Sequence, residues 1–224
     1  DFYNTLLRAK HNLASTERDL GNFEKARTLY KETWELHEKI RPDSPPIQLL
    51  YNMGRLHLEV SELDKAEEHL RESLEYSRKG GIPAGLFYNH IGLGDVALAR
   101  GDFSASIGFY NDSFEIAQKV NSPPFRIIAS EKLHEVYKKE GDFEQALKYH
   151  ELAKQVSDSL TGVQQDEQLA LAETELGLRQ QQKINQLLQE RQQQQEARIT
   201  AQNWLIGMSV LVIIVILISI VVLY

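Results

Sequence analysis

The chain has 224 residues, of which 42% are hydrophobic, and its formal net charge is −7. This acidic balance disfavours nucleic acid as a partner, because contacts to phosphate groups require an excess of Lys and Arg. Cysteine is absent, which excludes disulfides and thiol chemistry. The hydrophobic residues follow an amphipathic pattern up to about Asn203 and then form one charge-free run from Leu205 to Leu223.

A short sequence motif, which we call the turn motif, recurs along the chain at a spacing of 40 residues. It joins a small residue, an acidic or amide residue and an apolar residue, at Gly21-Asn22-Phe23, Ser61-Glu62-Leu63, Gly101-Asp102-Phe103 and Gly141-Asp142-Phe143. Small residues follow three positions later, at Ala26, Ala66, Ser106 and Ala146, and bulkier ones four positions after those, at Tyr30, Leu70, Tyr110 and His150. Self-similarity at a fixed period indicates a solenoid of stacked units.

Each unit is predicted to be a pair of antiparallel helices. The Gly at the first position of the turn motif tolerates the left-handed conformation that ends a helix, and the Asp or Asn after it can cap the next helix. Proline is expected to stop the second helix of a unit, at Pro42, Pro45 and Pro46, at Pro83, and at Pro123 and Pro124. The predicted helices are residues 5–20 with 23–40, 47–60 with 63–79, 84–100 with 103–120, and 125–140 with 143–159. The repeat domain covers residues 1–160, with units at about 7–46, 47–86, 87–126 and 127–160.

This pattern resembles the tetratricopeptide repeat (TPR), on the evidence of Leu93-Gly94, then Gly101-Asp102-Phe103, then Tyr110. The resemblance implies an all-α solenoid of four helix pairs. Three features depart from the family: the period of 40 exceeds the usual 34, Ser61 replaces the turn Gly, and His134 replaces the packing Gly. Longer helices explain the period, and His134 predicts a fourth unit that packs more loosely or at a different angle.

TPR-like solenoids bind along the concave face that the first helix of each pair forms, so a protein or peptide ligand is expected there. The repeat register places on that face Arg8, His11, Ser15, Arg18, Gln48, Tyr51, Arg55, Tyr88, Ile91, Asp95, Glu131, Glu135 and Lys138. Tyr51, Arg55 and Tyr88 are the strongest candidates, because Tyr and Arg are enriched at binding hot spots. The alternative for each is structural, a packed Tyr or a solvated charge. The family's clamp for C-terminal carboxylates is not visible, since His11 and Tyr51 occupy one of its Lys and Asn sites.

Residues 161–203 begin with a break at Thr161-Gly162 and are rich in Gln, Glu, Leu and Ala. Apolar or small residues at Leu169, Ala172, Leu176, Ile184, Leu187 and Ala201 approximate heptad spacing, which predicts a helical stalk that forms a weak coiled-coil homodimer. Residues 204–224 are predicted to cross a membrane, because the apolar run would span about 28 Å, close to the thickness of the hydrocarbon core. The alternative is a buried core helix.

The sequence motifs that resemble catalytic or nucleotide-binding sites are better explained by their positions in the repeat. His37-Glu38 with Pro42 resembles a kinase phosphoacceptor box, but it lies at the end of a repeat helix and no nucleotide-binding segment follows it. Gly92-Leu93-Gly94 occupies the packing position of the repeat rather than a phosphate loop. The histidines lack metal-ligand pairing at helical spacing. We therefore expect no metal, no cofactor and no enzymatic activity in this chain.

The order of repeats, stalk and one span resembles the extracytoplasmic half of bacterial TPR sensor proteins. The resemblance implies a fragment of a single-pass protein of the bacterial inner membrane, with the repeats in the periplasm. It also implies a cytoplasmic output domain beyond Tyr224, such as a histidine kinase, a diguanylate cyclase or a DNA-binding regulator. A tail-anchored adaptor that faces the cytoplasm, or an assembly scaffold, is the alternative.

Overall fold

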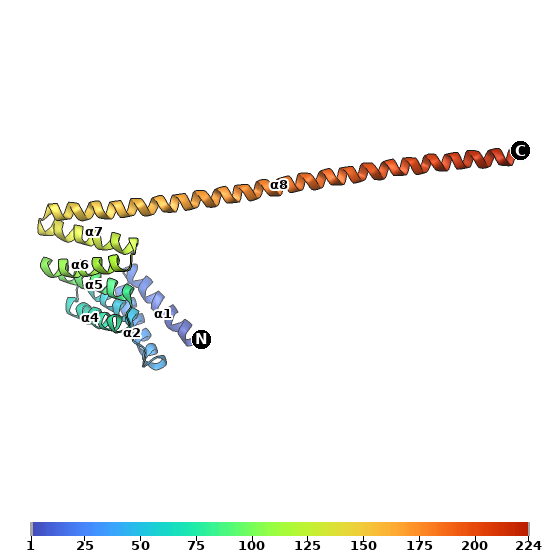
Figure 1. Ribbon diagram of the computed structural model, residues 1–224. Helices are drawn as coiled ribbons and strands as arrows, with labels where there is room; N and C mark the ends of the chain where they lie inside the picture. Colours follow the sequence, from blue (N-terminus) through green and yellow to red (C-terminus); the bar gives the residue numbers. More distant parts are fainter. Residues whose placement is uncertain (1, 224) are drawn as a thin grey trace. The chain divides into compact units, whose positions relative to one another are not determined.

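The computed structural model describes residues 2–223, except for the side chains at 163, 164, 166, 167, 197 and 211–223. These residues form α-helices and, within the described range, no strand (Figure 1). The helices are α1 (Phe2–Asp19), α2 (Phe23–Ile40), α3 (Ile47–Glu59), α4 (Leu63–Lys79), α5 (Pro83–Ala99), α6 (Phe103–Lys119), α7 (Pro123–Glu140) and α8 (Phe143–Leu223). The chain divides into two compact units, Asp1–Thr161, which we call the repeat unit, and Gly162–Tyr224.

The turn motif forms the turn between the two helices of each pair. Gly21, Gly101 and Gly141 have φ values of 79°, 78° and 95°, and Ser61 takes the same left-handed conformation at 60°. That conformation costs little for Gly and more for a residue with a side chain. The predicted turns therefore form even where Ser replaces Gly.

The acidic residue of the turn motif caps the following helix in two of the turns. The carboxylate of Asp102 accepts a hydrogen bond from the backbone N–H of Ala105 at 2.9 Å, and that of Asp142 accepts one from Gln145 at 3.1 Å. Asn22 makes no capping hydrogen bond to α2, and its amide nitrogen donates to the Glu17 carboxylate at 2.8 Å.

Two proline sites have a different role from the one predicted. Pro83 is the first residue of α5 and Pro123 the first residue of α7, so these prolines start helices rather than stop the preceding ones. The first helical residue has no intrahelical partner for its N–H, and the fixed φ of proline suits this position. The preceding turns instead place Gly81 and Asn121 at positive φ, 59° and 50°.

The first helices of the pairs form a continuous layer, in which α1 contacts α3, α3 contacts α5 and α5 contacts α7. Helices α1, α3 and α5 each pack against their own partner, and α3, α5 and α7 each pack against the second helix of the preceding pair. In the last pair, the ring of Tyr137 in α7 stacks on that of Tyr149 in α8 at 5.7 Å. Helix α5 lies at the centre and is buried on nearly every side, from Phe87 to Ala97. This layer positions the side chains of the candidate functional site.

Helix α8 continues through Thr161 and Gly162, where the sequence predicted a break. A single Gly costs about 1 kcal/mol in a helix, and the surrounding Gln, Glu, Leu and Ala are good helix formers. Across the described residues, no helical stretch is both long and apolar enough to pass through a membrane. The predicted span at 204–224 lies largely outside the described residues, since no side chain from 211 onward is included.

Glu62 links the first two repeats at the α3–α4 turn. Its carboxylate accepts hydrogen bonds from Arg27 of α2 at 3.1 Å, from Lys65 at 3.1 Å and from His57 Nδ1 at 2.7 Å. The bonds from Arg27 first, then from Lys65 and His57, lower the pKa of Glu62 from its ordinary value of 4.5 to about 2. The folded protein therefore favours the charged form.

We expect Glu62→Gln to lower the free energy of unfolding near neutral pH, where the carboxylate is charged. The wild-type advantage should be full above the ordinary carboxyl pKa of 4.5 and disappear as the pH falls towards 2. Urea unfolding of both chains across this range measures the difference. Glu72→Gln, at an exposed site within α4, is the control and should change the free energy of unfolding by less than about 0.5 kcal/mol. A Glu62→Gln difference that does not vary with pH would contradict the assignment.

Candidate functional site

A cavity of about 490 Å³ opens between α3 and α5 in the layer of first helices, and we call it the groove cavity. Facing positions of the two helices contribute aromatic and amide side chains to it. Its lining is Ile47, Gln48, Tyr51 and Asn52 from α3, and Ile82, Ala84, Gly85, Tyr88 and Asn89 from α5 and the turn before it. The cavity therefore brings together three residues predicted from sequence, Gln48, Tyr51 and Tyr88.

Aromatic rings continue from the groove cavity across the layer. The rings of Tyr51 and Tyr88 lie 6.0 Å apart, and the ring of Tyr88 meets that of Phe125 from α7 edge to face at 5.4 Å. Phe125 in turn stacks on the buried ring of Phe87 at 4.1 Å. Tyr88 is nevertheless 38% exposed, so its ring offers contact area that the fold does not cover.

Two asparagines complete the groove cavity, and sequence reasoning did not identify either. The Asn89 amide is almost fully buried, and its nitrogen donates to Ser73 Oγ at 2.9 Å and to the carbonyl of Gly85 at 2.8 Å. Its Oδ1 has no hydrogen-bond partner among the described residues. A buried polar atom without a partner is unfavourable, so a donor supplied by a ligand would stabilise it. A polar residue inside the apolar α5 was the available signal.

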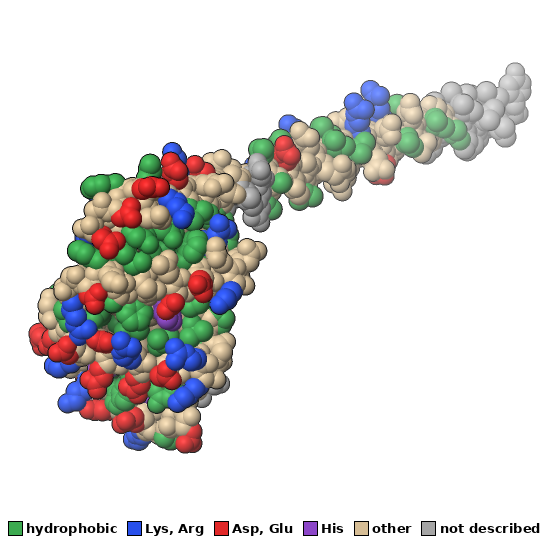
Figure 2. All heavy atoms as spheres, turned by 60° about the vertical axis from the view of Figure 1, so that its left-hand side comes forward, with side chains coloured by type: hydrophobic (Ala, Val, Ile, Leu, Met, Phe, Trp, Pro, Cys, Tyr) green, Lys and Arg blue, Asp and Glu red, His purple; other side chains and the backbone are tan. Residues whose placement is uncertain are grey.

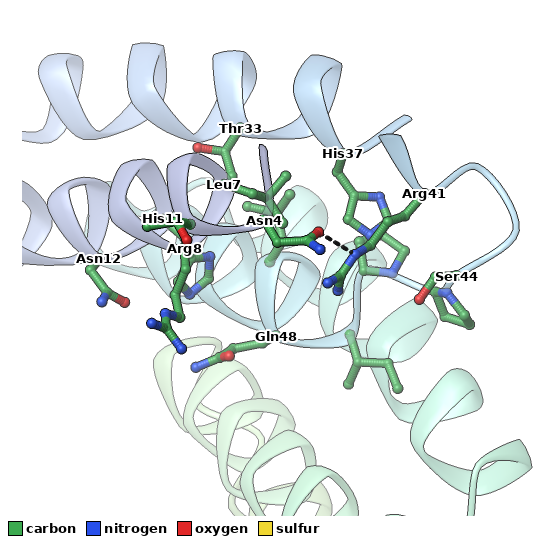
Figure 3. A pocket seen from close by; sticks show the side chains of 15 residues that line it. Asn4, Leu7, Arg8, His11, Asn12, Thr33, His37, Arg41, Ser44 and Gln48 are labelled. Atoms are coloured by element: carbon green, nitrogen blue, oxygen red, sulfur yellow. Dashed lines mark hydrogen bonds between the residues drawn. The ribbon is translucent and has the colours of Figure 1, made fainter. Parts of the chain in front are cut away.

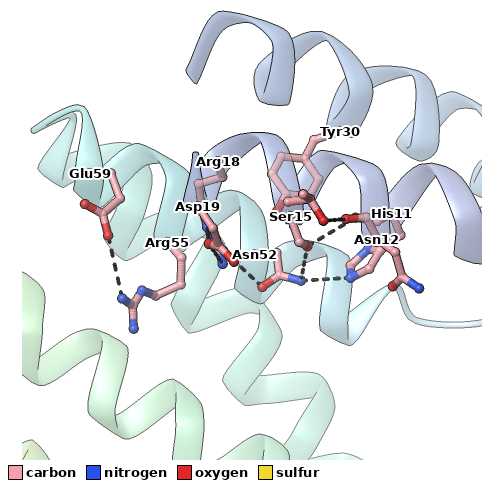
Figure 4. Close-up of polar contacts among 10 residues, drawn as sticks. His11, Asn12, Ser15, Arg18, Asp19, Tyr30, Asn52, Arg55 and Glu59 are labelled. Carbon is pink, nitrogen blue, oxygen red and sulfur yellow. Dashed lines mark hydrogen bonds and ion pairs between the residues drawn. The ribbon is translucent and has the colours of Figure 1, made fainter. Parts of the chain in front are cut away.

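The second asparagine, Asn52, joins α1 to α3 in a polar network (Figure 4). Its amide nitrogen donates to His11 Nε2 at 2.8 Å, and its Oδ1 accepts from Arg18 at 3.3 Å. Ser15 bonds to the hydroxyl of Tyr30 at 3.0 Å. Burial, and secondly the charge of Arg18, lower the pKa of His11. Three predicted residues of α1, His11, Ser15 and Arg18, therefore contact this network.

A charge cluster centred on Asp95 lies on the layer formed by α3, α5 and α7. Asp95 accepts hydrogen bonds from Lys132 at 2.8 Å and from the Tyr110 hydroxyl at 2.7 Å, and Arg55 approaches it to 3.7 Å. Burial lowers the pKa of Arg55, but Tyr51 and Asp95 outweigh burial and raise it. Burial, and then the charge of Asp95, raise the pKa of Tyr110. Lys132 was not among the predicted residues.

A second cavity, of about 640 Å³, lies between α1, the end of α2, the following loop and the start of α3, and we call it the N-terminal cavity (Figure 3). It collects the predicted residues Arg8, His11 and Gln48. Gln48 and Ile47 line both cavities, so the two are adjacent.

The remaining predicted residues do not join these cavities. Ile91 is only 3% exposed and belongs to the core around Phe87, because α5 is covered on almost all sides. Glu131 lines a smaller hollow with His134 and His150. Glu135 pairs with Lys139 on its own helix at 3.0 Å, and Lys138 is exposed.

Acidic and basic side chains are interspersed between apolar patches on the face of the repeat unit shown in Figure 2. Within the described residues, no group of three or more His, Asp or Glu side chains is arranged to hold a metal ion. The candidate site thus presents aromatic rings, amide groups and the Asp95 charge cluster.

The model of one protein family, described as the MalT-like TPR region, matches residues 3–219. A comparison with curated proteins finds no match. Aspartyl phosphate phosphatase F from Bacillus subtilis is similar in structure, with a TM-score of 0.65 and 12% identity over 72% of this chain and 42% of that chain. This chain thus spans less than half of the phosphatase.

Two further solved structures are similar. A signal transduction ATPase with numerous domains and a tetratricopeptide repeat sensor, from Pyrococcus horikoshii, has a TM-score of 0.58 and 21% identity over 74% of this chain and 26% of that chain. Nearly identical TPR-like repeats from Podosopora anserina have a TM-score of 0.54 and 18% identity over 69% of this chain and 76% of that chain. Because these sequence identities are low, the three similarities show the fold alone. The shared fold confirms the predicted TPR-like helix pairs.

Proposed function

The chain belongs to the MalT-like TPR family, and from that premise we propose that its groove cavity binds an extended peptide segment of a partner protein. Solenoid repeats present extended concave surfaces for recognition. The observation that carries the proposal is that one cavity is lined by the neighbouring rings of Tyr51 and Tyr88 and by Asn89, whose Oδ1 has no hydrogen-bond partner among the described residues.

Each part of the groove cavity matches a part of a peptide. An apolar side chain of the ligand fits beside the two tyrosine rings, where burial of apolar area supplies most of the affinity. A backbone N–H of the ligand can donate to an amide oxygen of the cavity. The Asp95 cluster, about two turns beyond Tyr88 on α5, favours a ligand whose polar groups can replace the bonds that Asp95 makes with Lys132 and Arg55.

The test begins with random peptides displayed on phage and selected against the full chain. The affinities of the selected peptides are then measured for wild type, Tyr51→Ala and Tyr88→Ala. Each substitution should weaken binding about 10- to 30-fold, since truncation of a hot-spot Tyr typically costs on the order of 1.4–2 kcal/mol. Tyr3→Ala, which removes a tyrosine that is 59% exposed outside the cavity, is the matched control. Selected peptides that bind all four chains equally would refute the groove assignment.

The proposal extends to a membrane-anchored sensor in the bacterial inner membrane, with the repeats in the periplasm. The charge-free run from Leu205 to Leu223 supports an anchor in the lipid bilayer, and the Gln-rich segment before it supports a stalk that pairs two copies. An output domain after Tyr224 would then receive the signal. A tail-anchored adaptor or scaffold is the second candidate, and the same apolar run favours it.

Protease digestion of intact and permeabilised cells separates these two candidates. If the repeat unit is cleaved once the outer membrane alone is opened, it is periplasmic, as a sensor requires. If it is cleaved only after the inner membrane is lysed, it faces the cytoplasm, and the adaptor replaces the sensor. Recovery of the whole chain in the soluble fraction would refute both forms of anchoring.

A further inference from the structure

The N-terminal cavity differs from the rest of the repeat unit in its charge. Two arginines, Arg8 from α1 and Arg41 from the loop after α2, line it together with His11 and His37. Among the residues that the structure describes, no Asp or Glu lines it, although the chain as a whole carries a net charge of −7. Asp43, in the bordering loop, is exposed and does not line the cavity. The cavity is therefore locally basic in an acidic protein.

The two arginines also lack the carboxylate partners that most arginines of the repeat unit have. Ion pairs hold Arg18, Arg27, Arg55, Arg71, Arg78 and Arg100. By contrast, Arg41 donates from Nε to the amide oxygen of Asn4 at 3.0 Å (Figure 3), and within the described part of the chain neither Arg8 nor Arg41 pairs with an acid. Their remaining N–H donors are available to a ligand, and the planar guanidinium suits the oxygens of phosphate or carboxylate.

Two largely buried histidines line the cavity beside these charges. His11 and His37 are each only 8% exposed, and burial lowers the pKa of both, assisted by Arg18 and Arg41 respectively. Both rings are therefore mostly neutral near pH 7. Because His11 Nε2 accepts from the Asn52 amide, its proton lies on Nδ1, which is a donor. The permanent positive charge of the cavity thus comes from the two guanidinium groups.

We propose that the N-terminal cavity binds a small organic phosphate, with Arg8 and Arg41 as the charged ligands of the phosphate group. A phosphate ester carries close to two negative charges and three acceptor oxygens, which matches two guanidinium groups better than a single carboxylate does. The volume of about 640 Å³ lies within the usual range for small-molecule sites and leaves room for the organic part. The site goes beyond peptide binding, and because Gln48 lines both cavities, the two ligands would be neighbours.

Isothermal titration calorimetry of the full chain at constant ionic strength tests the site. The probes are glycerol 3-phosphate, glucose 6-phosphate, inorganic phosphate, succinate as a dicarboxylate, and glycerol as an uncharged control. Saturable binding is expected for at least one phosphate ester, and weaker or no binding for succinate and glycerol. Binding of succinate as tight as that of every phosphate probe would overturn the phosphate assignment, and binding of no probe at millimolar concentration would overturn the site.

The variants Arg8→Gln and Arg41→Gln should each weaken phosphate binding at least about tenfold, because each removes a charge-assisted hydrogen bond. Arg78→Gln is the matched control, since it removes the same charge from an exposed arginine outside the cavity. Equal weakening in all three chains would reveal a general charge effect and refute the site. Thermal unfolding without ligand checks that the variants fold. Tyr51→Ala should keep phosphate binding, so this site and the peptide groove can fail independently.

Discussion

Asp95→Ala is expected to lower the free energy of unfolding by about 1–3 kcal/mol, because it removes the charged acceptor of a buried hydroxyl group. The Asp95 side chain is only 11% exposed and accepts hydrogen bonds from Tyr110 at 2.7 Å and from Lys132 at 2.8 Å. Its removal leaves the buried hydroxyl of Tyr110 without an acceptor. It also leaves the positive charges of Lys132 and Arg55 close together without the carboxylate between them.

Two further variants separate this effect from the loss of a negative charge alone. Glu115→Ala removes an exposed acid that pairs with Lys119 at 3.8 Å, and it should cost less than about 1 kcal/mol. Asp95→Asn keeps an acceptor for the Tyr110 hydroxyl, so its cost should fall between those of the two alanine variants. Urea unfolding of the four chains gives the comparison. A cost for Asp95→Ala no larger than that for Glu115→Ala would show that the cluster does not stabilise the fold.

Gly94→Ala should destabilise the repeat unit by about 1–3 kcal/mol, because it overfills a close contact between α5 and α6. A Cβ at this position would lie 2.3 Å from Cε1 and 2.6 Å from Cδ1 of the Tyr110 ring. Tyr110 is fully buried and its hydroxyl is bonded to Asp95, so the ring has little room to move.

Gly108→Ala provides the matched control, with an effect of opposite sign. Gly108 is an exposed residue within α6, and a Cβ there would meet nothing within 4 Å. Alanine should therefore stabilise the helix by up to about 1 kcal/mol through its higher helix propensity. Thermal unfolding by circular dichroism measures both changes. If Gly94→Ala raised the melting temperature as Gly108→Ala is expected to, the close packing of Tyr110 on α5 would be disproved.

The helix pairs were predictable because their signals are local and repeated. The turn motif predicted that α2, α4, α6 and α8 begin at Phe23, Leu63, Phe103 and Phe143, where the structure has them. Local signals were less informative at the proline sites, since proline both ends one helix and suits the first turn of the next. The break expected at Gly162 failed for a similar reason, because strong helix formers on both sides outweigh one glycine.

From the sequence, the candidate site could be assigned to the concave face of the first helices, but not to particular cavities on that face. The register identified Gln48, Tyr51 and Tyr88, which do line one cavity, but it also placed Ile91 there, although α6 and α7 help to bury α5 on that side. Asn52 and Asn89 were missed because their hydrogen-bond partners His11 and Ser73 lie 41 and 16 positions away, although a polar Asn89 within the apolar α5 was a signal. Lys132 was missed because its partner Asp95 lies 37 positions earlier.

The sequence by itself determined the 40-residue period, the pairing of helices and the conformation of their turns, because these depend on residues a few positions apart. Only the tertiary structure decided which side chains meet between repeats. Contacts such as Asp95 with Lys132, Tyr51 with Tyr88 and Asn52 with His11 join helices of different repeats. Their partners depend on the packing of the helices against one another, which determines where the cavities open and where charges remain unpaired.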